Sequence, residues 1–300
     1  MICTTSFLVL VLAAQGYVKR DTRAFDVASA DGRFRLHAAL VSEVSTVADP
    51  ACTFTGRGTY QLFEGTTRRW QRGLDCALED VRVLSDGSVA GLGYGETPAR
   101  DQDRAHVVFL APDGTPRLDQ RITCEGLGRD FAGCIERVRG WFVDEGERRI
   151  AAWSWSVPQK GEVWLVWSLA TGKPVEWRPR LADSPASFGC AGAVPVAGTG
   201  LVLVHAWVRG ERPTLYRSQY HLVDGSGLST WRFAVDDDRV EGEPGRAAPG
   251  ANGIVSVEGG AKPGLRVRCF GAKQIVRFEL TQDATTKAWT PREIERVATP

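Results

Sequence analysis

Three carboxylates at comparable places along the chain have the residue types needed for hydrolysis. Asp26, Asp80 and Glu136 each stand close to the expected start of a strand-like segment. Paired carboxyl groups can cleave a glycosidic bond, one acting as general acid and the other as base or nucleophile. If these strand starts converge, Asp26, Asp80 and Glu136 form a candidate catalytic set. The alternative is that they are solvated carboxylates at strand ends.

Four tryptophans form the second candidate site. Trp153, Trp155, Trp164 and Trp167 lie within the run from "RIAAWSWS" to "GEVWLVWS". Exposed indole rings stack well on sugars and peptides, so this group predicts a binding surface. The alternative is that these large, flat side chains pack between neighbouring sheets.

The histidines and serines add no site chemistry. His37, His106, His205 and His221 fall inside strand patterns and have no metal-ligand spacing. No G-x-S-x-G motif is present to indicate an activated serine. The sequence therefore predicts neither a metal site nor a cofactor.

The elements that position these residues are hairpins. "VWLVWSLATGKPVEW" contains two strand-like runs joined at Thr171-Gly172, which is typical of a β-hairpin. Similar hairpins recur along the chain, with turns at Gly65, Gly114, Gly225 and near Ala284.

A second series of hairpins precedes the first at a nearly constant offset, with turns at Gly32, Gly87, Gly146, Gly198 and Gly259. Four strands in each unit of about 55 residues favour a β-propeller over a β-sandwich, which would not double the period. We therefore predict an all-β fold with less than about a tenth of its residues in helices. Residues 17–300 are predicted to form a single propeller domain of five four-stranded blades, at 24–71, 80–122, 137–179, 192–234 and 253–291.

Some of these segments resemble known propeller blades. "TYQLFEGTTRRWQ" and "LVWSLATGKPVEW" resemble hairpins of quinoprotein-like and WD40-like bacterial propellers. "DVRVLSDGSVAGLGYG" resembles a V-x-x-DG hairpin of secreted bacterial propeller proteins. The resemblance implies a fold and little about activity. Two Asp and one Glu on successive blades also resemble the catalytic set of five-bladed furanosidases, although the surrounding residues do not.

The N-terminus has features of a signal peptide. Residues 6–14 are apolar but too short to cross a bilayer, and Ala14-Gln15-Gly16 supplies the small residues of a cleavage site. We therefore predict a signal peptide at residues 1–16 and a secreted or periplasmic protein. The alternative is a buried first strand.

Six cysteines remain once such a segment, with Cys3, is removed. An even number in an exported protein favours disulfides. Adjacent loops suggest Cys52–Cys76 and Cys124–Cys134, which leaves Cys190 with Cys269.

Charge and composition limit the partners. The 37 basic and 36 acidic residues leave a formal net charge of +1, which provides no global field for nucleic acid. No later segment is apolar enough to span a membrane, and a monomer is expected. The favoured hypothesis is a non-catalytic secreted propeller that binds a protein or glycan partner across its loop face. A glycoside hydrolase is the alternative.

Overall fold

The computed structural model describes residues 18–45, 53–95, 97–98, 105–122, 138–156, 161–181, 188–209, 215–241, 253–259, 262–269 and 274–298. These residues form strands, turns and irregular segments and contain no helix. The chain divides into two compact units, Met1–Arg129 and Asp130–Pro300.

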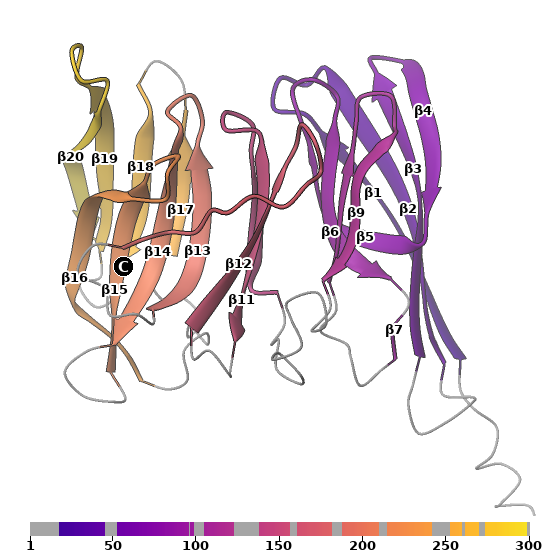
Figure 1. The fold of residues 1–300 in the computed structure, drawn as a ribbon, viewed down its shortest axis with the longest axis horizontal. Helices are drawn as coiled ribbons and strands as arrows, with labels where there is room; N and C mark the ends of the chain where they lie inside the picture. Colours follow the sequence, from indigo (N-terminus) through magenta and orange to yellow (C-terminus); the bar gives the residue numbers. More distant parts are fainter. Residues whose placement is uncertain are drawn as a thin grey trace, which may run out of the picture. The chain divides into compact units, whose positions relative to one another are not determined.

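The N-terminal unit contains two antiparallel sheets (Figure 1). The first has the order β1 (Val18–Ala28), β2 (Phe34–Ser45), β3 (Thr53–Glu64), β4 (Thr67–Leu74), and the short β7 (Thr97–Pro98) pairs with β3. The second has the order β5 (Cys76–Val83), β6 (Val89–Gly95), β8 (Ala105–Leu110), β9 (Pro116–Ile122).

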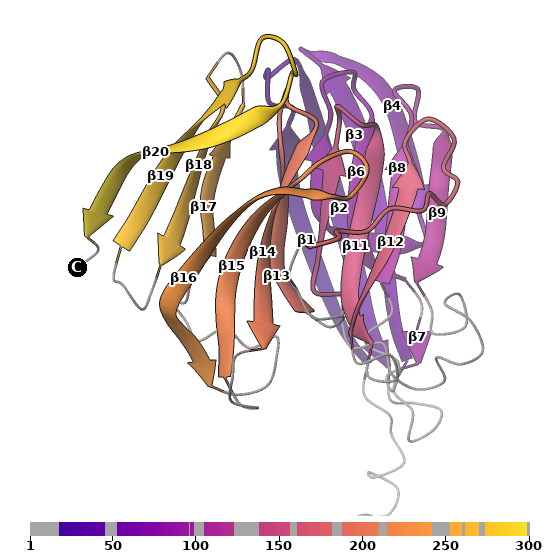
Figure 2. The same ribbon diagram turned by 60° about the vertical axis from the view of Figure 1, so that its left-hand side comes forward.

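The C-terminal unit contains three antiparallel sheets, which Figure 2 shows from a second side. The first comprises β10 (Gly140–Asp144), β11 (Arg149–Ser156) and β12 (Gly161–Ser168). The second comprises β13 (Phe188–Val196), β14 (Leu201–Arg209), β15 (Leu215–Val223) and β16 (Ser229–Glu241). The third comprises β17 (Gly253–Glu258), β18 (Gly264–Cys269), β19 (Gln274–Gln282) and β20 (Trp289–Ala298).

Apart from the short β7, which pairs with β3, strand order within each sheet follows chain order. The all-β prediction is confirmed for the described residues, and successive antiparallel meanders are consistent with a β-propeller. The arrangement of the sheets as five blades of one domain stays a prediction.

Asp-Gly turns close many of the hairpins. The side chains of Asp31, Asp86 and Asp113 each accept a hydrogen bond from the backbone N–H two residues further on. The glycine that follows each aspartate has a positive φ, which a side chain would disfavour. Because the aspartate supplies its own turn contact and the glycine supplies the conformation, these turns are encoded locally.

Apolar and polar residues alternate along the strands, and the apolar side chains form three cores. In the N-terminal unit, buried residues such as Leu36 and Leu62 of the first sheet pack in one cluster with Leu78 and Val108 of the second. In the C-terminal unit, one core lies between the β10–β12 and β13–β16 sheets, and another lies between the β13–β16 and β17–β20 sheets. Each core therefore joins consecutive sheets within one unit.

Polar groups on aromatic side chains form hydrogen bonds with the backbone of the next sheet. The Tyr60 hydroxyl on β3 donates to the Cys76 carbonyl on β5 (3.1 Å) and accepts from the Leu78 N–H (2.7 Å). In the C-terminal unit, the Tyr220 hydroxyl on β15 donates to the carbonyls of Gly253 on β17 (3.3 Å) and Arg268 on β18 (2.8 Å). Both rings are fully buried, and burial raises the pKa of Tyr60 above its usual range.

A third tie joins the first two sheets of the C-terminal unit. The Trp153 indole N–H on β11 donates to the Cys190 carbonyl on β13 (3.3 Å). The Cys190 N–H in turn donates to the Glu162 carboxylate on β12 (2.8 Å). A β-bulge lies in the β13 ladder between Cys190 and Gly192, and such bulges leave backbone groups without ladder partners.

The predicted fourth strand of the third sheet is wrong. After the turn at Gly172, pairing with β12 reaches Val175, whose N–H donates to the Val166 carbonyl (2.8 Å), and continues no further. Pro174 and Pro179 carry no N–H, and the Trp177 side chain is buried. A fourth strand here would lack the backbone donors of the two prolines and would take the Trp177 side chain out of the core, so no such strand forms.

The segment after Trp177 instead crosses to the turn between β15 and β16. The Arg180 N–H donates to the Gly227 carbonyl (2.6 Å), and the Ser229 N–H donates to the Arg180 carbonyl (3.1 Å). This parallel bridge joins the first two sheets of the C-terminal unit.

Replacing Gly227 with alanine is expected to destabilise the C-terminal unit. Gly227 has φ +90°, and a Cβ there would lie 2.3 Å from the Arg178 carbonyl oxygen. Gly198 is the matched control because its φ is +77° but a Cβ would meet no atom within 4 Å. In urea unfolding, Gly198→Ala should lower the free energy of unfolding by about 1 kcal/mol, and Gly227→Ala should lower it by about 3 kcal/mol. Equal losses would contradict the close approach at Arg178.

Candidate functional site

Asp26 and Asp80 do not begin strands as predicted, so that part of the prediction is wrong for these two residues. Asp26 stands near the end of β1 because that strand already begins at Val18, and Asp80 stands in the middle of β5. Both are about half exposed, and each faces a cationic or basic neighbour on its own sheet. The distance from Asp26 to His37 Nδ1 is 3.0 Å, and that from Asp80 to Arg82 is 3.8 Å.

Asp26 belongs to the first sheet and Asp80 to the second, while Glu136 lies outside the described residues. An exposed carboxylate beside a basic side chain suits a surface contact more than a general acid. Their catalytic role stays a prediction.

Three of the four predicted binding tryptophans belong to the core of the C-terminal unit or its margin. Trp153 and Trp164 are cross-strand partners whose rings stack with centroids 5.0 Å apart. Trp153 and Trp167 are buried, and Trp164 is half-buried. The side chain of Trp155 lies outside the description. Trp153 therefore packs between the first two sheets of the C-terminal unit, and the burial of Trp167 likewise leaves no exposed ring for a ligand.

The aromatic cluster also contains two residues that the sequence analysis missed. Trp177 meets Trp164 edge-on at 5.7 Å, and Phe142 meets Trp177 edge-on at 6.1 Å. The sequence feature that could have pointed to Trp177 was its position at the end of a predicted strand. Once pairing stops at Val175, that side chain can turn into the core.

A buried ion pair adjoins this cluster. Arg149 donates to the Asp144 carboxylate (3.0 Å), and its guanidinium lies 4.2 Å from the Trp177 ring centroid. Both charged side chains are only 6% exposed. Arg149 and Asp144 are cross-strand partners at the ends of β11 and β10, so opposite charges flanking the hairpin "DEGERR" were the available signal.

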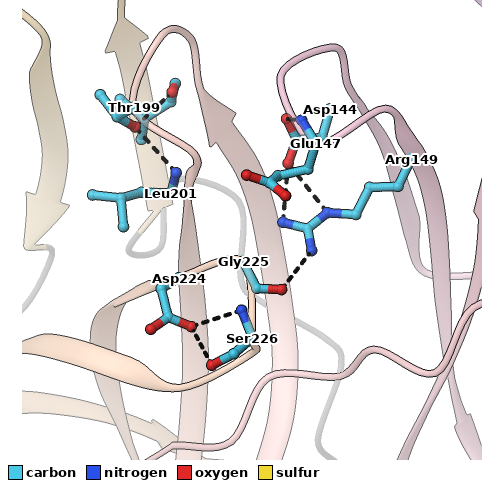
Figure 3. A network of polar contacts seen from close by, with 9 residues as sticks. Asp144, Glu147, Arg149, Thr199, Leu201, Asp224, Gly225 and Ser226 are labelled. Atoms are coloured by element: carbon cyan, nitrogen blue, oxygen red, sulfur yellow. Dashed lines mark hydrogen bonds and ion pairs between the residues drawn. The ribbon is translucent and has the colours of Figure 1, made fainter.

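Arg149 also reaches the next sheet. Its guanidinium donates to the Gly225 carbonyl in the β15–β16 turn (3.4 Å), as Figure 3 shows. Asp144 accepts a further bond from the Glu147 N–H (3.2 Å). Because both charges are enclosed and mutually paired, the network fastens turns together and offers no free acid or base.

The two histidines of the β13–β16 sheet are buried. His205 Nε2 lies 3.0 Å from the Ser218 hydroxyl, and burial lowers the pKa of His205 to about 3. His221 contacts Ser229 and Gln219, and its pKa is lowered to about 4, chiefly by burial. Although a serine next to a histidine can be a nucleophile and its base, Ser218 is fully buried, so this pair acts as a neutral core contact.

The predicted disulfides are wrong where the structure describes both partners. Cys190 and Cys269 are buried thiols that form no disulfide, and Cys76 is likewise a buried thiol outside any disulfide, so it is not joined to Cys52. Cys190 and Cys269 belong to different cores, which explains why they cannot pair. Cys52, Cys124 and Cys134 lie outside the described residues.

The cysteines act as small apolar side chains. Burial raises the pKa of the Cys76 thiol to about 12 and that of Cys190 well above its usual value. Cys76 begins β5 and Cys190 is the third residue of β13, and their carbonyls accept the aromatic ties from the preceding sheet. Cys76 and Cys190 therefore occupy similar positions because the sheets themselves repeat.

No three His, Cys, Asp or Glu side chains within the described ranges are grouped as metal ligands would be. The same residues include no helix that could cross a membrane.

Comparisons with known proteins yield structural likenesses only. No family model and no curated protein matches the chain. The chain is similar to Hsv2 of Kluyveromyces lactis (TM-score 0.35, 9% identity, covering 93% of this chain and 100% of that one). It is also similar to prolyl oligopeptidase B of Galerina marginata (TM-score 0.43, 11% identity, covering 91% of this chain and 42% of that one). A third similar structure is the dihydro-heme d1 dehydrogenase NirN (TM-score 0.28, 13% identity, covering 93% of this chain and 66% of that one). At these values the similarities say nothing about activity or partners.

Thiol titration tests the corrected cysteine assignment. In denaturant without reductant, at least three thiols should react, namely those of Cys76, Cys190 and Cys269. In the folded protein the same thiols should react slowly, because they are buried and the pKa of Cys76 is about 12. The Cys269→Ser variant should lower the denatured count by one. A count of zero in the unaltered protein would contradict the assignment.

The buried histidines predict a loss of stability at mildly acidic pH. Unfolded histidine takes up a proton near pH 6.5, whereas His205 and His221 stay neutral in the folded protein down to about pH 3 and 4. Lowering the pH through 6.5 therefore favours the unfolded state. Each histidine should lower the free energy of unfolding by about 1 kcal/mol between pH 7 and 5.5. The urea midpoint should fall over this range, and His221→Gln should reduce the slope. An unchanged slope in that variant would contradict the prediction.

Proposed function

We propose that this chain is a non-catalytic, secreted binding protein, built as a five-bladed β-propeller, that recognises a protein or glycan partner across its loop face. One observation carries the proposal: the described core uses its reactive side chains for structure. Arg149 and Asp144 neutralise each other, His205 contacts Ser218, and the Tyr60 hydroxyl satisfies the backbone of the next sheet.

The layout of the sheets supports a binding role. Short turns close β1–β2, β5–β6, β8–β9 and β15–β16, whereas long connections separate Ser45 from Thr53, Ile122 from Gly140 and Glu241 from Gly253. In an antiparallel meander these long connections leave from the opposite end of the sheet to the short turns. A rigid framework with long loops at one end suits recognition, because loops tolerate variation while strands hold them in place.

Export remains part of this proposal and rests on the apolar segment 6–14, which lies outside the described residues. Cys76, Cys190 and Cys269 form no disulfide, so they give no support to export, and Cys124–Cys134 stays a prediction. Buried thiols are compatible with either compartment, since they are shielded from oxidants and reductants alike.

Binding and hydrolysis can be separated with the full chain. Screening an oligosaccharide library and a protein-partner library should yield saturable binding, with every bound oligosaccharide recovered intact. Asp80→Asn and the exposed control Glu176→Gln should leave affinity within about twofold, because neither is proposed to contact the partner. Cleavage of a glycan that is lost in Asp80→Asn and kept in Glu176→Gln would overturn the proposal in favour of a glycoside hydrolase.

A further inference from the structure

The β10–β12 sheet of the C-terminal unit ends in a strand that is paired along only part of its outer side. The Val175 N–H donates to the Val166 carbonyl (2.8 Å), and the chain then leaves the sheet. Next to residues 161–165, no strand of the described ranges pairs with this side of β12. We call residues 161–165 the β12 edge. It is about 16 Å long, given the rise per residue of a strand.

The register shows which backbone groups face outward along the β12 edge. In an antiparallel ladder, the N–H and C=O of alternate residues point to the same side of a strand. The Val166 carbonyl and the Ser168 N–H both point away from β11, because they bond Val175 and Lys173. The pairing of β11 with β12 has no register shift, so the backbone N–H and C=O of Trp164 point to the same outer side. No described residue pairs with them there.

The Trp164 side chain also has an unused donor. Its ring stacks on Trp153 with centroids 5.0 Å apart and meets Trp177 edge-on at 5.7 Å. The Trp164 indole N–H is enclosed, yet it has no hydrogen-bond partner in the part of the chain that the structure describes. Enclosed donors are normally paired. An unpaired one on the residue whose backbone is also unpaired points to an acceptor that the described chain does not supply.

The next sheet has one strand more than this one. Cys190, Ala206, Gln219 and Ala234 are successive cross-strand partners in the β13–β16 sheet. Cys190 and Ala206 belong to the core shared with β10–β12, so Gln219 and Ala234 face the same way. Because three strands pack on four, the outermost strand β16 has no counterpart, and Ala234 is exposed. A strand added to the β12 edge would supply that counterpart.

The segment that leaves β12 supplies positive charge. Residues 173–180 contain three cationic side chains and one carboxylate. Arg178 and Arg180 are exposed, and neither pairs with a carboxylate among the described residues. Arg178 directly follows Trp177, whose ring contacts that of Trp164. A cationic segment therefore lies beside one end of the β12 edge.

We propose that the β12 edge binds an extended acidic peptide segment of another protein, which adds to the sheet as a fourth strand. The Trp164 N–H and C=O would bond the peptide backbone, as in other cases of strand addition to an open edge. Apolar β-branched residues at alternate positions would pack beside Trp164 and cover Ala234. In an antiparallel arrangement the N-terminal end of the peptide lies next to Val175, where acidic residues meet the cations of residues 173–180.

Charge favours a different protein over a second copy of this chain. A second copy that pairs through the same edge would bring its own cationic residues 173–180. Such a copy offers no acidic residues at the position where Arg178 requires them, whereas an acidic peptide does.

The inference goes beyond the proposed loop-face function. Every residue that it uses belongs to the C-terminal unit. In a propeller the sheets pack face to face around an axis, so the edge of an outermost strand lies at the rim and is not covered by the neighbouring blade. Export and loop-face binding are not required, so the two proposals fail separately.

Fluorescence anisotropy with the full chain tests backbone pairing. The probe is a labelled, amidated peptide with two glutamates followed by alternating valine and threonine (EEVTVTV), and it should bind saturably. Two further forms carry N-methyl groups either on the valines or on the threonines. Because only alternate N–H groups of an added strand face β12, one form should bind at least about tenfold more weakly. The other should bind within about threefold of the parent peptide.

Charge is tested by matched variants. The double variant Arg178→Gln/Arg180→Gln should weaken binding of EEVTVTV about fivefold. The control Lys262→Gln/Lys287→Gln removes the same charge from exposed turns of the β17–β20 sheet and should change affinity less than about twofold. All four side chains are exposed, so folding should persist, and circular dichroism verifies it. The peptide KKVTVTV should bind at least about tenfold more weakly than EEVTVTV.

Several outcomes would overturn the inference. They are no saturable binding of EEVTVTV, equal affinities of the two N-methylated forms, equal losses in the two double variants, or equally tight binding of KKVTVTV. A dimer in analytical ultracentrifugation that EEVTVTV dissociates would assign the edge to a second copy and also overturn it. If EEVTVTV fails while the library screens find a partner at the loops, the proposed function stands and this inference falls. If EEVTVTV binds as expected and the screens find no partner at the loops, the reverse holds.

Discussion

Two pairs of consecutive sheets, one in each unit, depend on satisfying backbone groups where the first strand of the second sheet departs from a regular ladder. At the bulge of β5 the Leu78 N–H turns to the Tyr60 hydroxyl, and at the bulge of β13 the Cys190 N–H turns to Glu162. A buried amide without a partner would cost about 1 to 3 kcal/mol, so these side chains determine which sheets can pack together. Leucine and valine fill the cores, but they cannot provide such contacts.

The C-terminal unit shows how a missing strand can be compensated. Its first sheet has three strands, and the chain that would have made the fourth carries Trp177 into the core and bonds the β15–β16 turn. Arg149 lies over Trp177, beside Asp144, and reaches the same turn. Such a pair is costly to desolvate, and its value lies in specifying one arrangement of the turns. The same enclosure makes these charges unsuited to catalysis.

Much of the fold was predictable because it is encoded locally. The Asp-Gly pairs at Gly32, Gly87 and Gly114 marked hairpin turns that the structure contains, since a positive φ and an Asx contact need only neighbouring residues. The absence of a fourth strand after Gly172 was not predictable from alternation, because the segment from Pro174 to Trp177 has a strand-like pattern although it forms no strand. The Cys52–Cys76 and Cys190–Cys269 predictions were wrong because a count of cysteines does not show which are buried: Cys76 and Cys190 pack in the cores near the starts of their strands.

What the sequence by itself determined is therefore the all-β class, the hairpins and their turns, which depend on periodicity and on residues a few positions apart. Only the tertiary structure decided which face of each strand is buried. Trp153 was predicted to bind a partner and Cys190 to form a disulfide, and both are core residues because a second sheet covers them. His37 and Gln71 are far apart in the chain, and they share one row of the first sheet because the strand register aligns both with Gln61. Burial and register depend on distant strands, so no local pattern could have specified either.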